Sequence, residues 1–177
     1  MAYHGQLIFI LILQVRFIHL AFFRLRPGFS VLALHGGMHQ MKRMSVYEQF
    51  CEEESAVLFA TDIAARGLDF PSVDWVVQMD CPDDVSSYIH RAGRTARNDQ
   101  KGDALLMLLP SEEAMVAHMI EKKIPITEIQ VNHDRLYTIQ RKLESMLAKD
   151  TELKEVSYSF IALLFELLIH FHVPPFN

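Results

Sequence analysis

Residues 56–80 read AVLFATDIAARGLDFPSVDWVVQMD, and two short apolar runs within this stretch decide the fold. AVLFAT, from Ala56 to Thr61, and DWVVQMD, from Asp74 to Asp80, are nearly continuous in apolar residues, which predicts strands that are buried on both faces. Such strands are typical of parallel sheets whose crossover connections carry helices. The stretch therefore predicts two neighbouring β-α-β units.

The same alternation of short apolar runs and amphipathic segments continues on both sides of this stretch. We expect further strands at LIFILIL (7–13), VLALH (31–35) and ALLMLLP (104–110). We expect helices at 14–24, 40–51 and 83–91, a helix from a cap at Ser111 to about residue 123, and a helix at 134–149. In the last helix the apolar residues form one stripe, and Arg141 and Lys142 face solvent. The sequence thus predicts an α/β domain with a parallel sheet flanked by helices.

Length and composition limit the classes of function. The chain has 177 residues, of which 50% are hydrophobic and 22% charged, so one α/β domain with a core of ordinary size is expected. The formal net charge of -5 gives no global basic signature, so any contact with phosphate must be local. Cys51 and Cys81 lack CxxC spacing, and His35 and His39 have no further ligand at a fitting distance in the sequence, so we expect no metal site.

The two ends of the chain differ from its middle. Residues 7–23 are apolar but interrupted by polar side chains, and they fall short of the ~20 apolar residues that a membrane span needs, so we expect no membrane partner. After Glu155 the composition becomes apolar nearly all round, which is typical of a buried helix, a membrane-associating segment or appended sequence. We divide the chain into an apolar N-terminal segment (1–13, containing the first strand), a central domain (14–150) and a divergent tail (151–177).

Three segments bring glycine and charged residues to the carboxyl ends of predicted strands, where ligands bind in open α/β sheets. The first segment is LHGGMHQMKR. Gly36 and Gly37 allow a tight turn or the close approach of a ligand, and Gln40 and Arg43 share one face of the following helix. Taken alone, this segment is explained better by an ordinary glycine turn than by a phosphate site.

The second segment is LFATDIAARGLDF. Thr61 offers a hydroxyl directly after a buried strand, Asp62 can cap a short helix, and Asp69 is presented on the loop beyond. Capping and a surface loop explain part of this pattern. They do not explain why one strand end should gather Thr, Asp, Arg and Asp.

The third segment is YIHRAGRTAR. Arg91, Arg94 and Arg97 recur every three residues around Gly93, which concentrates positive charge in an acidic chain. An anion or an acidic partner is needed to offset that repulsion, and arginine suits phosphate because its rigid fork holds two oxygens at once. A solvated basic face is the alternative interpretation.

In this order, the three segments resemble the QxxR, TDxAARGLD and HRxGRTxR motifs of the second domain of DEAD-box RNA helicases. The resemblance covers about residues 14–150 and implies a RecA-like fold, the C-terminal lobe of a helicase. FFRLRPG, LPSEEAMV and KKIPITEI are similar to the eukaryotic nucleolar members that act in small ribosomal subunit assembly. That similarity implies a place in the nucleus and nucleolus, a part in rRNA processing, and pre-ribosomal assembly factors as partners.

The resemblance also implies roles for residues on the nucleotide side. Arg94 and Arg97 would reach the γ-phosphate of ATP as arginine fingers, and Asp69 would meet the ribose. His90 and Arg91 would contact the acidic motif of the first domain, so that closure of the two domains is coupled to hydrolysis.

On the RNA side, the resemblance implies backbone contacts that carry no sequence preference. Gly36, Gly37, Arg43 and Thr61 would hold the RNA backbone, and Gln40 would help to order that segment.

The sequence contains no GxxxxGKS or GxxxxGKT motif, which would bind phosphate. It also contains no DEAD sequence, which would hold magnesium. We therefore expect ATP and Mg²⁺ to be held mainly by a first RecA-like domain, a partner outside this sequence. The full-length protein is expected to be an ATP-dependent RNA helicase, and this fragment alone to be inactive. The alternative is a truncated, non-enzymatic isoform that binds RNA or protein.

Overall fold

The computed structural model describes residues 5–10, 30–62, 68–96, 101–129 and 140–157. Its elements, in chain order, are β1 (Gln6–Ile10), β2 (Ser30–Leu34), α2 (Gln40–Glu52), β3 (Ala56–Ala60), β4 (Trp75–Gln78), α4 (Val85–Ala92), β5 (Asp103–Leu106), a 3-10 turn (Pro110–Glu112), α5 (Ala114–Glu121) and α6 (Gln140–Lys149). Residues 151–157 are also helical.

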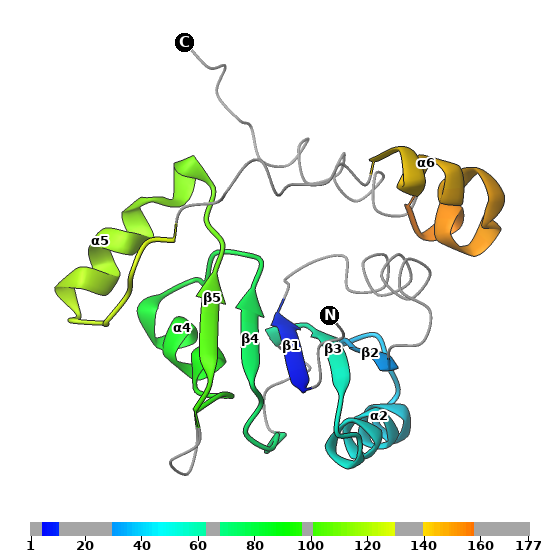
Figure 1. Cartoon of the computed structure of the whole chain (residues 1–177), viewed down its shortest axis with the longest axis horizontal. Helices are drawn as coiled ribbons and strands as arrows, with labels where there is room; N and C mark the ends of the chain where they lie inside the picture. The colour runs from blue at the N-terminus through cyan, green and yellow to red at the C-terminus, as the bar shows by residue number, and fades with distance from the viewer. Residues whose placement is uncertain (1–4, 11–29, 63–67, 97–100, 130–139, 158–177) are drawn as a thin grey trace.

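The five strands form one parallel sheet in the order β2-β3-β1-β4-β5 (Figure 1). β1 lies in the middle, where Ile8 is level with Leu58 of β3 on one side and with Val76 of β4 on the other. The predicted α/β fold with a parallel sheet is confirmed. The apolar N-terminal run therefore supplies the central strand of the sheet.

Both faces of the sheet are apolar, as the continuous hydrophobic runs predict. On the face that packs against α2, one cluster joins side chains from β1, β2 and β3 to Phe50 of α2 and to Phe70. On the opposite face, Val31, Val57 and Phe59 form a second cluster, in which the rings of Phe9 and Phe59 stack with centroids 4.9 Å apart. Figure 1 shows α2 below the sheet and α6 above it.

Local hydrogen bonds fix the ends of the helices that matter for the site. The side-chain amide of Gln6 in β1 donates to the carbonyl oxygens of Phe50 (2.8 Å) and Glu53 (2.6 Å), which closes the C-terminus of α2. At the start of α4, the carboxylate of Asp84 accepts from the backbone N–H of Ser87 at 2.6 Å. α2 and α4 are therefore held at one end by side chains that the sequence places for that task.

The predicted cap at Ser111 is wrong. Ser111 lies within the 3-10 turn, where the carboxylate of Glu112 accepts from the backbone N–H of Leu109 at 2.8 Å, and α5 begins at Ala114 without a side-chain cap. Pro110 explains the difference, because a proline at the first position of a turn needs no N–H partner and so starts the turn earlier.

Towards the C-terminus, Arg141 and Lys142 are exposed, as predicted. Asp150 caps the helical residues 151–157 by accepting from the backbone N–H of Leu153 at 3.0 Å, and Leu153 is 1% exposed. The predicted helix at 14–24, the first part of the helix at 134–149 and the apolar tail after residue 157 lie outside the described residues. Within the described ranges, no helix combines the length and the apolar composition needed to cross a membrane.

Candidate nucleic-acid and nucleotide interface

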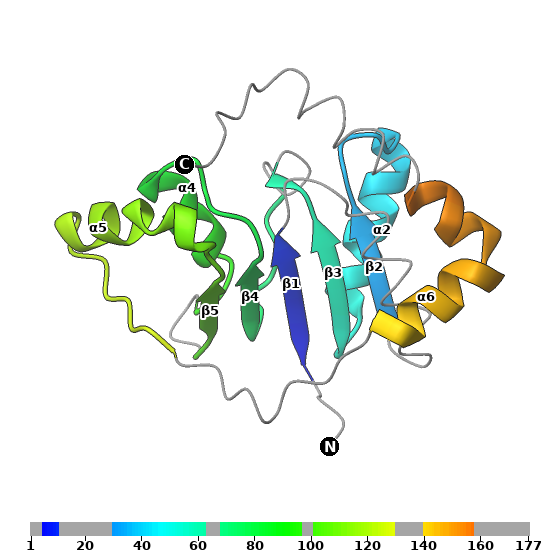
Figure 2. The ribbon, with the colours of Figure 1, turned by 90° about the horizontal axis from the view of Figure 1, so that it is seen from above.

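The segments that follow β2 and β3 meet at one edge of the sheet. Because all five strands are parallel, their carboxyl ends lie together, at the top of the sheet in Figure 2. The backbone N–H of Thr61, directly after β3, donates to the carbonyl oxygen of Leu34 at the end of β2 (3.0 Å). The segment after β3 is thereby joined to the turn after β2, so residues 27 positions apart in sequence share one surface.

The turn after β2 presents bare backbone. The carbonyl oxygen of His35 accepts from the N–H of Met38 at 3.1 Å, and Gly36 and Gly37 between them are exposed. Neither glycine has a positive φ, and a Cβ at Gly36 would meet nothing within 4 Å. Glycine is therefore not required by the backbone here; its effect is to leave the peptide groups uncovered.

At the first turn of α2, Arg43 and Gln40 lie side by side. The Nη1 group of Arg43 donates to Oε1 of Gln40 at 3.2 Å. Arg43 is half-buried, and the first turn of the helix carries no acidic residue. A helix N-terminus carries partial positive charge, so this turn is suited to an anion.

Arg91 is buried and paired within the chain. The residue is 4% exposed; its Nε donates to Oδ1 of Asp62 at 2.8 Å, its Nη2 forms a second, short bond to Oδ2, and its Nη1 donates to the carbonyl oxygen of Asp80 at 3.0 Å. The bidentate pair joins the segments that follow β3 and β4. Among the described residues, the acidic partner of Arg91 is thus Asp62 of the same chain, while the neighbouring His90 is exposed; the contact of these two residues with the acidic motif of a first domain stays a prediction.

Asp69 precedes β4 and Arg94 follows α4, and a hydrogen bond joins these two segments. The Nη1 group of Arg94 donates to the carbonyl oxygen of Leu68 at 3.0 Å, and the hydroxyl of Tyr47 in α2 donates to the carbonyl oxygen of Asp69 at 2.7 Å. Asp69 is exposed and Arg94 is half-buried. Arg97, the second predicted arginine finger, lies outside the described residues.

Gly102 lies outside the three segments named above. It leaves room for the side chain of Thr95, next to Arg94. The hydroxyl of Thr95 donates to the carbonyl oxygen of Val73, and the N–H of Val73 donates to the carbonyl oxygen of Arg94 at 3.2 Å. A Cβ at Gly102 would lie 1.8 Å from Oγ1 of Thr95, so no larger residue fits without displacing that hydroxyl. In the sequence, only the position of this glycine near the start of an apolar run could have indicated its role.

Two buried polar groups lie near this edge. Gln78, the last residue of β4, is 0% exposed, and no described residue is a hydrogen-bond partner for either polar atom of its side chain. Burial, together with the carboxylates of Glu112 and Asp83, raises the pKa of the Cys81 thiol, and the charge of Arg91 opposes that shift. Cys81 is therefore a neutral thiol at neutral pH.

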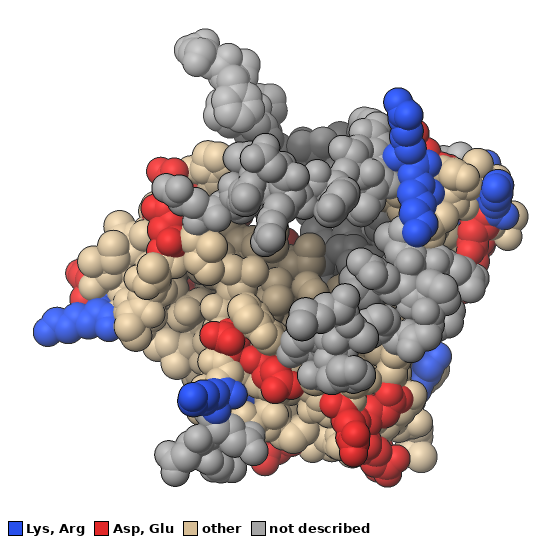
Figure 3. All heavy atoms as spheres, viewed as in Figure 1, with Lys and Arg blue, Asp and Glu red and all other residues tan. Residues whose placement is uncertain are grey.

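Charge is local on this molecule. In Figure 3 the Lys and Arg side chains stand apart at the rim and form no continuous basic field, while acidic side chains gather along the lower rim. Among the described residues, no three His, Cys, Asp or Glu side chains come together as metal ligands. Any contact with phosphate therefore depends on individual arginines and backbone N–H groups.

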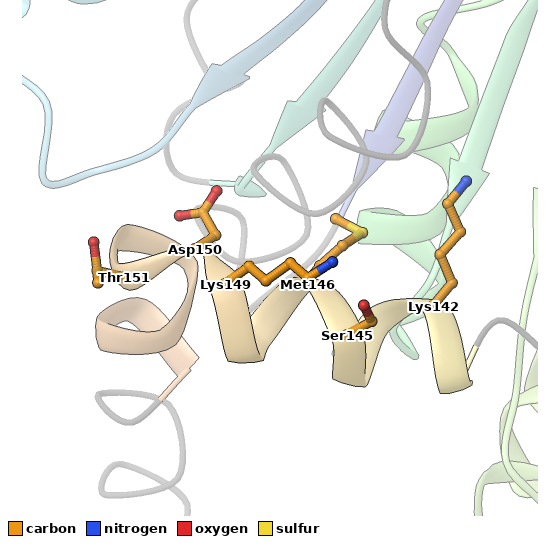
Figure 4. Close-up of a pocket in the computed structure, with 6 residues that line it drawn as sticks. All are labelled: Lys142, Ser145, Met146, Lys149, Asp150 and Thr151. Carbon is orange, nitrogen blue, oxygen red and sulfur yellow. The ribbon is translucent and has the colours of Figure 1, made fainter.

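A shallow hollow on α6 contains none of the predicted site residues (Figure 4). Its lining consists of Lys142, Ser145, Met146, Lys149, Asp150 and Thr151. Its two lysines share the hollow with an aspartate, so it carries no strong charge.

Comparison with known families matches residues 2–99 to the helicase conserved C-terminal domain. The chain belongs to the helicase C-terminal domain family. A human relative, the probable ATP-dependent RNA helicase DDX10, is 59% identical over 142 residues, which are 80% of this chain and 16% of that protein. The ATP-dependent RNA helicase dbp4 of Schizosaccharomyces pombe is 48% identical over 152 residues, 85% of this chain and 21% of that protein. This helicase C-terminal domain therefore spans about a fifth or less of the length of these relatives.

Solved structures give the same family. Domain 2 of the DEAD-box helicase Mss116p bound to an RNA duplex matches 96% of this chain and 68% of that chain, with a TM-score of 0.68 and 26% identity. The C-terminal domain of the DEAD-box protein Dbp5 matches 84% of each chain, with a TM-score of 0.60 and 25% identity. The helicase C-terminal domain is thus of the DEAD-box type, and its fold is the predicted RecA-like one.

Proposed function

We propose that this chain is the C-terminal lobe of an ATP-dependent RNA helicase, with an RNA side at the carboxyl ends of β2 and β3 and a nucleotide side formed by the segments of Asp69 and Arg94. The observation that carries the proposal is the bonding that unites its motif segments: Arg91 pairs with Asp62, and Arg94 bonds to Leu68 beside Asp69. The segments are thereby held in one surface rather than scattered over the molecule. The RNA duplex in the Mss116p domain 2 structure and the names of the helicase relatives support the same assignment.

On the RNA side, the uncovered peptide groups of Gly36 and Gly37, the side chain of Arg43 and the hydroxyl of Thr61 bind the sugar–phosphate backbone. Such groups hold the strand without reading its bases. Contacts to 2′-hydroxyls distinguish RNA from DNA. Gln40 keeps Arg43 in place through the hydrogen bond between their side chains.

On the nucleotide side, Arg94 and Arg97 meet the γ-phosphate and Asp69 meets the ribose of an ATP molecule held mainly by the other RecA-like lobe. The geometry of Arg94 and Asp69 fits this task, since the bond from Arg94 to Leu68 holds Arg94 next to the segment that presents Asp69. Mg²⁺ bound with ATP would neutralise charge on the phosphates. Arg94 stabilises the charge that develops during hydrolysis, and an arginine finger contributes on the order of 10³–10⁵ in rate.

Within this scheme, His90 at the exposed end of α4 contacts the acidic motif of the other lobe. Arg91 supports His90 from within the chain, because the guanidinium of Arg91 is bonded to Asp62 and Asp80. Closure of the two lobes over ATP and RNA then bends one RNA strand and releases its partner.

RNA binding is tested with the whole chain and a fluorescent RNA duplex, by anisotropy over a range of salt concentrations. Arg43→Ala should weaken binding to all sequences alike and lower the slope of log K against log salt by about one, because one phosphate contact is lost. Lys122→Ala is the control, since Lys122 is an exposed single charge at the end of α5, on the opposite side of Figure 1 from α2. Equal effects of both variants, or no RNA binding by the parent chain, would contradict the RNA side of the proposal.

The nucleotide side is tested after joining the chain to a DEAD-box ATP-binding lobe. Arg94→Ala and Arg97→Ala should each remove most RNA-stimulated hydrolysis and leave RNA affinity without nucleotide nearly unchanged. Arg43→Ala should do the opposite. If all three variants lose RNA affinity equally and keep the rate per bound RNA, the three arginines form one RNA-binding patch and the finger assignment is wrong.

We further propose that the intact protein works in the nucleolus on ribosomal RNA, together with pre-ribosomal assembly factors. The identity of 59% to DDX10 and the segments LPSEEAMV and KKIPITEI support this assignment. Crosslinking of the tagged full-length protein to RNA in cells is the test. Crosslinks spread over messenger RNA, with none enriched on pre-ribosomal RNA, would contradict it.

A further inference from the structure

Tyr47 connects the helix that begins at the RNA side to the loop that faces the nucleotide. Its hydroxyl donates to the carbonyl oxygen of Asp69 at 2.7 Å, across 22 positions of sequence. Asp69 uses its backbone for this bond, so its carboxylate is still presented from the exposed loop. The bond therefore positions Asp69 without competing for its functional group.

The ring of Tyr47 packs the same loop against α2. It meets the ring of Phe70 edge to face, with centroids 5.2 Å apart and planes at 72°, and Phe50 approaches Phe70 in the same manner at 5.8 Å. Phe70 is 1% exposed. The aromatic contacts fix how closely the loop approaches the helix, and the hydroxyl bond fixes which peptide group of the loop faces it.

Tyr47 follows Arg43 by four residues, so the two side chains lie one turn apart on the same side of α2, about 6 Å along the axis. On the far side of Asp69, the neighbouring carbonyl oxygen of Leu68 accepts from Arg94. A continuous set of bonds thus runs from Gln40 and Arg43, along one helical turn, through Tyr47 to the loop and on to Arg94. None of the three sequence motifs includes Tyr47.

We propose that Tyr47 is the positioning residue that transmits RNA binding at the start of α2 to the Asp69 loop and Arg94. The proposal rests on the proposed function, because it assumes that RNA binds at Gly36–Arg43. RNA that orders the first turn of α2 restrains Tyr47, and Tyr47 restrains the loop through the carbonyl oxygen of Asp69. The nucleotide-facing groups are then better ordered when RNA is bound than when it is absent.

The test is amide hydrogen exchange of the whole chain, with and without a saturating RNA duplex, followed in peptides covering residues 36–43 and 68–73. Tyr47→Phe removes the hydroxyl and keeps the ring against Phe70. Glu48→Ala is the matched control, since Glu48 follows Tyr47 in α2 and its side chain is exposed. RNA affinity is measured for each variant beforehand by anisotropy.

In the parent chain and in Glu48→Ala, RNA should slow exchange in both regions. In Tyr47→Phe, RNA should still bind within about twofold and slow exchange at 36–43, but the RNA-dependent slowing at 68–73 should disappear. Exchange at 68–73 without RNA should rise about fivefold, because one hydrogen bond that limits local opening is lost.

A merely structural role for Tyr47 would raise exchange at 68–73 equally with and without RNA and keep the effect of RNA intact; that result overturns the proposal. So does a parent chain that binds RNA, is protected at 36–43 and shows no change at 68–73. A parent chain that binds no RNA overturns the proposed RNA side itself, and the affinity measurement identifies that case separately.

Discussion

Removal of the Asp62 carboxylate should destabilise the domain strongly. The side chain of Arg91 is 3% exposed and that of Asp62 is 23% exposed, so Asp62→Ala leaves a guanidinium buried with one described bond, to the carbonyl oxygen of Asp80. Breaking a buried pair by removing one partner costs about 3–5 kcal/mol. Because water screens the exposed part of Asp62, we expect about 3 kcal/mol, the low end of that range.

Urea denaturation followed by circular dichroism measures this cost. With a slope of about 2 kcal/mol per molar urea, the midpoint should fall by about 1.5 M. The double variant Asp62→Leu with Arg91→Met removes both charges and keeps apolar volume, so it should recover at least about 2 kcal/mol of that loss. If Asp62→Ala costs less than about 1 kcal/mol, or if the double variant is no more stable than the single one, the buried ion pair does not hold these segments together.

Two further predictions concern buried polar groups at the same edge. Gln78→Met should raise the free energy of unfolding by about 1–3 kcal/mol, because the side-chain amide is fully buried and has no described partner. Urea denaturation measures this free energy. A loss of stability would show that the amide has a partner. Cys81 should react with iodoacetamide more slowly in the folded chain than in the urea-unfolded chain at about pH 8, because its pKa is raised above the ordinary value of 9.0 and the thiolate is the reacting form. The same shift means that this contribution to folding stability is fully present below the ordinary pKa of 9.0 and is lost as pH rises through the raised pKa of the folded chain, so a folded chain that reacts as fast as the unfolded one would contradict both statements.

The strands were predictable because burial on both faces of a sheet requires a short, continuous run of apolar residues, which can be recognised in the local sequence. AVLFA needs no knowledge of its partners to be recognised as a buried strand, and the same holds for the run that became β1. The start of α5 was not predictable in the same way, because Pro110 begins a separate 3-10 turn in which Glu112, and not Ser111, bonds to the backbone of Leu109.

The site was predictable as a set of segments but not as a set of contacts. Glycine, threonine and arginine at strand ends identify the edge, since their chemistry suits phosphate. The pairing of Arg91 with Asp62 joins residues 29 positions apart, and the bond from Tyr47 to Asp69 joins residues 22 apart. Arginines spaced every three residues look alike in the sequence, so which of them is buried and which faces a ligand is decided only by the packing of α4 on the sheet.

The central place of β1 has a consequence for how the chain is made. Ile8 leaves the ribosome first, yet its partner in β3 is Leu58 and its partner in β4 is Val76, which follows 68 positions later. At about 5–20 residues per second, the apolar strand waits roughly 3–14 s during synthesis before both neighbours exist. Until β3 has been made LIFI presents two unpaired strand edges, and until β4 has been made it still presents one, so the nascent chain is most exposed to aggregation, and most dependent on chaperones, before the sheet has been assembled.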